Sequence, residues 1–195
     1  GTKQGGRLSP LLFGMFIEQL HELITMQLPG SGPLVEGMHV PDIMFADDVK
    51  LVTGSPGELQ SLLDVLHLFC LLFDMPVHVS PRKTCIVLYG RARDVARARV
   101  QQVWRLGDQV VPVCDSYTDL GLQCTTASGM HNAHVPLAQG GRKAMHSLLT
   151  LCKQHRIVQP DLKLRLFNTM VDPAVSYGCQ VWGPWLFHKK WRTPM

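Results

Sequence analysis

The stretch HVPDIMFADDVKLVTG (residues 39–54) places two adjacent carboxylates, Asp47 and Asp48, inside an otherwise apolar run. Neighbouring residues of a β-strand point to opposite faces of the sheet, so two consecutive aspartates can share one side only at the tip of a tight hairpin. We therefore predict two short strands within residues 38–53 that meet at the acidic pair.

The segments on either side of this hairpin predict helices. Apolar residues recur at helical spacing from Leu11 to Ile24, with Ser9 as the expected N-cap and Pro10 as the first helical residue. Ser55 and Glu58 fit a capping box at the start of a second helix, which extends to about residue 73.

The rest of the chain predicts an extended segment and turn (75–84), a strand (85–90), a short basic helix (93–104) and a hairpin around Gly107-Asp108. Helical patterns follow in residues 138–155 and 160–183. The expected fold class is α+β, with an antiparallel sheet first and a helical segment after it.

The composition is that of a globular protein. The chain has 195 residues, of which 46% are hydrophobic and 17% charged, with a net charge of +4 that is compatible with a polyanionic partner but does not require one. Apolar runs are too short for a membrane span, and no secretory signal is recognisable. None of the six cysteines forms a C-x-x-C pair, so we expect free thiols, no membrane association, and an intracellular location in nucleus or cytoplasm.

Two adjacent carboxylates repel each other, and their burial without a partner is costly. A divalent cation removes both problems, and Mg²⁺ accepts one or two carboxylates together with water and substrate phosphates. The alternative is that Asp47 and Asp48 form a turn in solvent and bind nothing.

Five segments in the same order resemble the reverse transcriptases of non-LTR (LINE-type) retrotransposons. FADD (45–48) is similar to their Y/F-A-D-D hairpin, and GTKQGGRLSPLLF (1–13) to the Q-G loop and helix upstream of it. MPVHVSPRKTCIVLYG (75–90), SYTDLGLQC (116–124) and LKLRLFNTMVDPAVSYGCQVWG (162–183) resemble later segments of that family. The resemblance implies a partial polymerase palm in residues 1–128 and a helical thumb in residues 129–195.

The resemblance also implies roles for single residues. Asp47 and Asp48 would bind the metal, two Mg²⁺ ions in the intact enzyme, and Lys83 would be a catalytic proton donor near the nucleotide phosphates. Gln4, Gly5 and Phe45 would contact nucleotide, template or primer, and Leu120 and Gly121 would form the primer grip. An RNA template, a DNA primer and dNTPs would be the partners.

The match is incomplete, and this leaves other functions open. The family has a third carboxylate on a strand before the Q-G loop, and no aspartate precedes Asp42 here. We therefore expect the isolated chain to be inactive. Arg7 and His78 stand where proline and asparagine are usual. The alternatives are a non-catalytic relic or domesticated module that binds nucleic acid through basic helices, and a metal-free helical interaction module.

Overall fold

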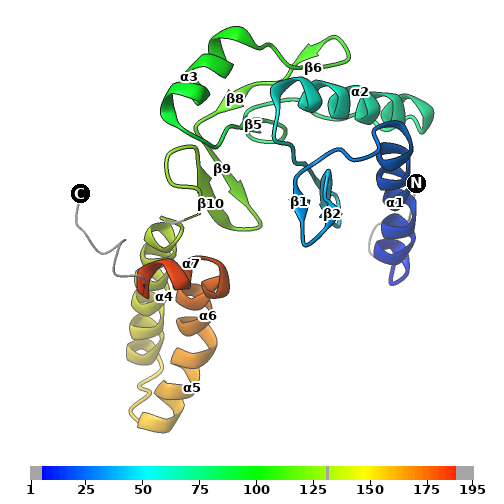
Figure 1. The fold of residues 1–195 in the computed structure, drawn as a ribbon. Helices are drawn as coiled ribbons and strands as arrows, with labels where there is room; N and C mark the ends of the chain where they lie inside the picture. The colour runs from blue at the N-terminus through cyan, green and yellow to red at the C-terminus, as the bar shows by residue number, and fades with distance from the viewer. Residues whose placement is uncertain (1–5, 131, 188–195) are drawn as a thin grey trace. The chain divides into compact units, whose positions relative to one another are not determined.

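The structure, a computed structural model, describes residues 6–130 and 132–187 (Figure 1). The chain divides into two compact units. Unit 1 contains the chain up to Ile86 together with Arg91–Cys114, and unit 2 contains Val87–Gly90 and the chain from Asp115 onward.

The core of unit 1 lies between two helices, α1 (Ser9–Gln27) and α2 (Pro56–Leu72). Its buried members are Ile17, Leu20 and Ile24 of α1 and Leu62, Val65 and Phe69 of α2. The helix α1 begins one residue earlier than the sequence predicts: Leu8 occupies the N-cap position and makes no side-chain cap, so the expected cap at Ser9 is wrong. The apolar residues Leu11, Leu12 and Met15 of its first half are exposed.

The strands before Asp115 are short and pair two by two. They are β1 (Leu34–Val35) with β2 (Met38–His39), β3 (Asp42–Phe45) with β4 (Asp48–Leu51), β5 (Ile86–Val87) with β8 (Val113–Cys114), and β6 (Arg105–Leu106) with β7 (Gln109–Val110). The hairpins at 38–53 and around Gly107-Asp108 are confirmed. The helix α3 (Ala92–Gln101) confirms the predicted basic helix.

The helix α2 anchors the β6–β7 hairpin through polar side chains. The amide of Gln60 accepts a hydrogen bond from Arg105 N and donates one to Arg105 O, each at 2.9 Å. The indole of the buried Trp104 donates to Pro56 O at 3.0 Å. These bonds fix the segment after α3 to the start and middle of α2.

From Asp115 onward, the described part of unit 2 consists of one hairpin followed by helices. The hairpin is β9 (Ser116–Asp119) with β10 (Leu122–Thr125). The helices are α4 (His134–Gln154), α5 (Pro160–Met170), α6 (Asp172–Ser176) and α7 (Cys179–Phe187), with α4 running alongside α5 and α6 (Figure 1). A Cβ at Gly141 of α4 would overlap the Val175 side chain of α6, so glycine allows the close approach of these helices.

The described part of the chain therefore mixes helices with short strands. Among the described residues the strands form separate two-stranded pairs rather than one sheet. The 116–125 hairpin lies with the helices in unit 2, and the expected palm and thumb limits stay predictions. Over the described ranges, no helix has both the length and the apolarity that crossing a lipid bilayer would require.

Candidate functional site

The acidic pair lies at the tip of the β3–β4 hairpin in unit 1. Phe45 pairs with Asp48, so only Ala46 and Asp47 form the turn. Both aspartates are exposed, and so is Phe45, at 61% of its surface. The hairpin therefore presents two carboxylates and an aromatic ring to solvent within four consecutive residues.

Ala46 adopts a positive φ of 53° in this turn. This left-handed region is unfavourable for residues that carry a Cβ, by roughly 1–2 kcal/mol, and such residues cluster at functional sites. The turn thus holds a strained residue directly beside the carboxylates.

The two faces of the hairpin have different surroundings. Met44, Val49 and Leu51 pack against the α1–α2 core, whereas Ile43 and Phe45 are exposed. The alternation follows from the two-residue period of a strand. One face of the hairpin therefore packs against the core, and this packing supports the strands that carry the tip.

Asp42 lies on the core side of β3 and is paired with α1. Its side chain is only 4% exposed, and Oδ1 lies 2.7 Å from Nδ1 of His21. The sequence alone did not reveal this pair. The available signal was that Asp42 shares a strand face with Met44, and a buried carboxylate requires a polar partner. Because Asp42 is held on the core face, it does not serve as a further acid at the tip.

Glu58 fixes the end of the same hairpin to α2. Its carboxylate accepts hydrogen bonds from the hydroxyl of Thr53, which follows β4, and from Gly32 N at 2.7 Å. The Thr53 hydroxyl and then the Gly32 N–H lower the pKa of Glu58 below the ordinary carboxyl range. Ser55 caps α2 by accepting from Glu58 N at 3.2 Å, so this half of the predicted capping box is confirmed.

Lys83 lies on a separate turn of unit 1, between β4 and β5 in the sequence. Lys83 N and Thr84 N donate to Ser80 O at 3.0 and 2.9 Å, and Ser80 forms an isolated bridge with Thr84. The Lys83 side chain is exposed. The turn thus holds the lysine on the surface in a defined backbone conformation.

Leu120 and Gly121 form the two-residue turn of the β9–β10 hairpin in unit 2, with φ values of 45° and 83°. Two consecutive positive φ values are typical of a type I′ hairpin turn. Tyr177 covers this turn: its hydroxyl donates to Leu120 O at 2.6 Å, and a Cβ at Gly121 would lie 3.2 Å from its ring. Gln4 and Gly5 lie outside the described residues.

The donor chemistry at the hairpin tip fits a hard cation. Asp47 and Asp48 offer carboxylate oxygens, the ligands that Mg²⁺ prefers, and one or two carboxylates suffice when water and phosphate complete the shell. Within the described part of the chain, no group of three or more His, Cys, Asp or Glu side chains could hold a metal ion. Asp47 and Asp48 thus supply suitable donor atoms, and water, phosphate or further ligands would have to complete any Mg²⁺ shell.

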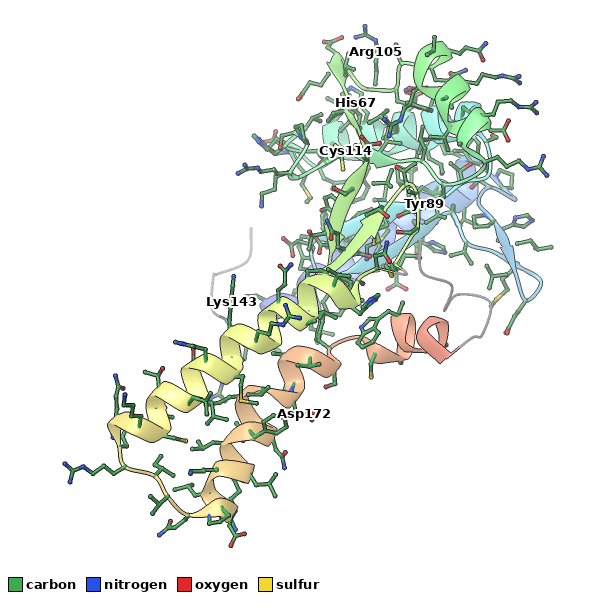
Figure 2. The ribbon with its side chains drawn as sticks, turned by 90° about the vertical axis from the view of Figure 1, so that its left-hand side faces the viewer. His67, Tyr89, Arg105, Cys114, Lys143 and Asp172 are labelled. Atoms are coloured by element: carbon green, nitrogen blue, oxygen red, sulfur yellow. The ribbon has the colours of Figure 1, made fainter. Side chains whose placement is uncertain are left out.

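A second candidate surface is the helix α4, which carries positive charge and no acidic residue along its 21 residues. Arg142, Lys143 and Lys153 are exposed, while Gly141 and Leu148 are buried. Lys143 projects away from the neighbouring helices (Figure 2). The three cations lie within residues 142–153, which is about 17 Å of helix at 1.5 Å per residue.

The chain is similar to two proteins of mobile elements. It is 26% identical over 184 residues to a retrovirus-related Pol polyprotein from a type-1 retrotransposable element of Popillia japonica, covering 92% of this chain and 24% of that protein. It is 25% identical over 153 residues to a putative uncharacterized transposon-derived protein of Caenorhabditis elegans, covering 76% and 50%. Neither a protein-family model nor a solved structure matches.

These similarities show that the chain is of retrotransposon-related origin. The chain spans about a quarter of the length of the first relative and half that of the second.

Proposed function

We propose that this chain is a segment of an RNA-directed DNA polymerase of a non-LTR (LINE-type) retrotransposon. One observation carries the proposal: Asp47 and Asp48 are exposed at the tip of a hairpin whose other face is fixed by the core. The similarity to a retrotransposon Pol polyprotein supports it. The reaction is nucleotidyl transfer from a dNTP to a primer 3′-hydroxyl on an RNA template.

The residues of this chain have distinct roles in the proposed reaction. Asp47 and Asp48 would hold Mg²⁺, which would supply charge stabilisation to the transferring phosphoryl group. Lys83 donates a proton near the nucleotide phosphates. Phe45, which pairs with Asp48, supports the primer end, and the Leu120–Gly121 turn grips the primer strand.

Polymerase activity requires a further carboxylate next to this hairpin, because the adjacent pair alone cannot complete two metal shells. We therefore propose the activity for a polypeptide in which another segment supplies that acid. The segment described here contributes the acidic hairpin, Lys83 and the basic helices.

Primer extension by the complete retrotransposon polypeptide that carries this segment tests the proposal. Asp47→Ala should lower the rate by more than the roughly 10–100-fold that loss of an outer-shell metal partner costs. Asp108→Ala is the matched control, because Asp108 also lies in a two-residue hairpin turn of unit 1. Equal rates for the two variants would contradict the assignment of Asp47.

A second experiment tests metal binding by the segment alone. Mn²⁺ added to the isotope-labelled chain should broaden the amide signals of residues 45–49 selectively, and Asp47→Asn should remove most of this broadening. The Asp108→Asn chain should behave like the unaltered chain. Uniform broadening at every exposed carboxylate would show that the hairpin tip is no preferred site.

A second candidate function is nucleic-acid binding without catalysis, and the acid-free surface of α4 favours it. Lys and Arg side chains along a helix neutralise phosphates irrespective of sequence, so binding weakens as salt rises. Replacing Arg142 and Lys143 by Gln should reduce the salt dependence of RNA–DNA duplex binding by about one unit of slope per lost phosphate contact.

Arg93→Gln on α3 is the control for this experiment, because Arg93 is also exposed but lies in unit 1. An unchanged salt slope in the α4 variant would contradict a role for this helix. Binding that survives Asp47→Ala while primer extension is lost would separate the two candidate functions.

A further inference from the structure

A hollow in unit 2 lies where α4 ends and α5 begins. The two helices lie side by side and are joined by residues 155–159 (Figure 1). The hollow has a volume of about 610 Å³, and ligand sites commonly measure about 300–1,000 Å³. Residues of α4, of the joining segment and of α5 all contribute to its lining.

Aliphatic side chains make up half of this lining, namely Leu148, Leu149, Ile157 and Val158. Leu148 is buried, whereas Leu149 and Val158 are 61% and 77% exposed. Aliphatic surface is therefore left open to solvent in a concave position. Exposed apolar patches that adjoin polar residues are typical of interaction sites.

Three cations, Lys153, Arg156 and Lys163, share the lining with these aliphatic residues. All three are exposed. In the described ranges no acidic side chain forms an ion pair with them. Asp161, in the first turn of α5, lines a separate hollow. The positive charge beside the aliphatic surface therefore complements an acidic ligand.

Arg156 stands beside the hollow in a backbone conformation that favours glycine, with a φ of 52°. Its N–H donates to Lys153 O at 3.3 Å, and Ile157 N donates to Cys152 O at 2.9 Å. These two bonds form a Schellman motif at the end of α4, where glycine is the usual residue at the position of Arg156. Residues held in such a conformation cluster at ligand-binding sites.

We propose that this hollow binds an acidic amphipathic helix of a partner protein. The aliphatic side chains of the partner would cover Leu149 and Val158, and its carboxylates would pair with Lys153, Arg156 and Lys163. The inference goes beyond the polymerase and nucleic-acid proposals, because it holds whether or not the chain takes part in either.

The lining favours a protein segment over other anionic ligands. Single-stranded nucleic acid binds by stacking its bases on aromatic side chains, and among the described residues that line the hollow none is aromatic. A small amphiphile is usually enclosed over most of its surface, whereas Leu149 and Val158 are largely exposed. An amphipathic helix lays only one apolar face into a groove and keeps the other in water.

The first test measures fluorescence anisotropy of a labelled synthetic helix mixed with the purified chain. The probe carries leucine at i, i+3, i+4 and i+7 and glutamate on the flanking positions. We expect saturable binding that weakens as salt rises. A probe with glutamine for glutamate, or with serine for leucine, should bind about tenfold more weakly or worse. Absence of saturable binding by the first probe would overturn the proposal.

Matched variants locate the binding surface. Leu149→Ser should weaken binding of the probe by about tenfold, whereas Leu164→Ser, 60% exposed on α5 and outside the lining, should leave it unchanged. Lys163→Gln should weaken it about threefold, and Arg165→Gln, outside the lining, should not. Sensitivity to Lys163→Gln without sensitivity to Leu149→Ser would show recognition of charge alone, as for nucleic acid, and would overturn the proposal.

Arg156→Gly separates binding from folding. Removal of the strained side chain should raise the thermal midpoint by about 2–4 °C, while binding of the probe should weaken about threefold. A stabilised variant with unchanged affinity would contradict the role of Arg156. On the unaltered chain, the probe should shift the amide signals of residues 148–158 and 163, and shifts confined to unit 1 would overturn the site.

Discussion

The hydroxyl of Tyr177 donates a 2.6 Å hydrogen bond to the carbonyl of Leu120, and its ring covers Gly121 at the same turn. A residue after α6 thus holds the tip of the β9–β10 hairpin within unit 2. The expected primer-grip turn has a fixed conformation because a distant side chain stabilises it.

Gly121→Ala should destabilise unit 2 by more than Gly129→Ala. Both glycines have positive φ, but a Cβ at Gly129 meets nothing within 4 Å, whereas at Gly121 it lies 3.2 Å from Tyr177. Each substitution should cost about 1–2 kcal/mol from the backbone alone, and Gly121→Ala should cost more. Urea unfolding measures the difference, which should vanish in a Tyr177→Ala background; a difference that persists there would contradict the contact.

Asp42→Ala should lower the free energy of unfolding of unit 1 by about 1.5–3 kcal/mol, the usual range for a hydrogen bond to a charged group. The carboxylate is almost fully buried against His21. Asp48→Ala on the exposed face of the same hairpin should change stability by less than about 0.5 kcal/mol. Denaturant titration followed by circular dichroism compares the two variants. Equal losses of unfolding free energy would contradict a stabilising role for the buried Asp42 carboxylate.

Glu58→Gln should reduce stability at neutral pH but not in acid. Hydrogen bonds from Thr53 and Gly32 lower the pKa of Glu58 in the folded state. Stability from a lowered carboxyl pKa is fully present above the unfolded value and is lost as the pH falls through the folded value. The urea midpoints of the unaltered chain and the Glu58→Gln variant should therefore differ at about pH 7. They should converge when the pH falls below the ordinary range of glutamate pKa values. A gap that stays constant through the acid range would contradict this origin.

Cys85 should react slowly with iodoacetamide in the folded chain. The reactive species is the thiolate, and a pKa of about 12 for Cys85 compares with about 8.5 for a free cysteine, so the thiolate fraction at pH 8 is lower by roughly a thousandfold. The alkylation rate should rise about tenfold per pH unit between about pH 8 and 10. Mass spectrometry resolves this rate from that of Cys179, which is exposed; similar rates for both in the folded state would contradict the shifted pKa.

Local patterns predicted much of the secondary structure. The hairpin at Asp47 and Asp48, the cap at Ser55 and the turn at Gly107-Asp108 depend on neighbouring residues, and the sequence shows these directly. The start of α1 was misplaced because Ser9 fits both the cap and the first helical turn, and only tertiary structure distinguishes the two.

Long-range pairs were not predictable in the same way. The contacts of His21 with Asp42 and of Tyr177 with Leu120 join residues that only the folded chain brings together. Strand alternation indicates that Asp42 lies on the buried face of its strand. No local pattern indicates that Tyr177 contacts the turn at Leu120. The assignment of Lys83 depends on a family resemblance, because an exposed lysine on a turn has no signature of its own.

Unit 2 is interrupted in the sequence. Its first piece, Val87–Gly90, lies between two stretches of unit 1, so the polypeptide passes from one unit to the other after Ile86, Gly90 and Cys114. A single cut or splice junction at any of these positions cannot separate the two units intact. Any continuous fragment that keeps one unit whole therefore also carries residues of the other unit.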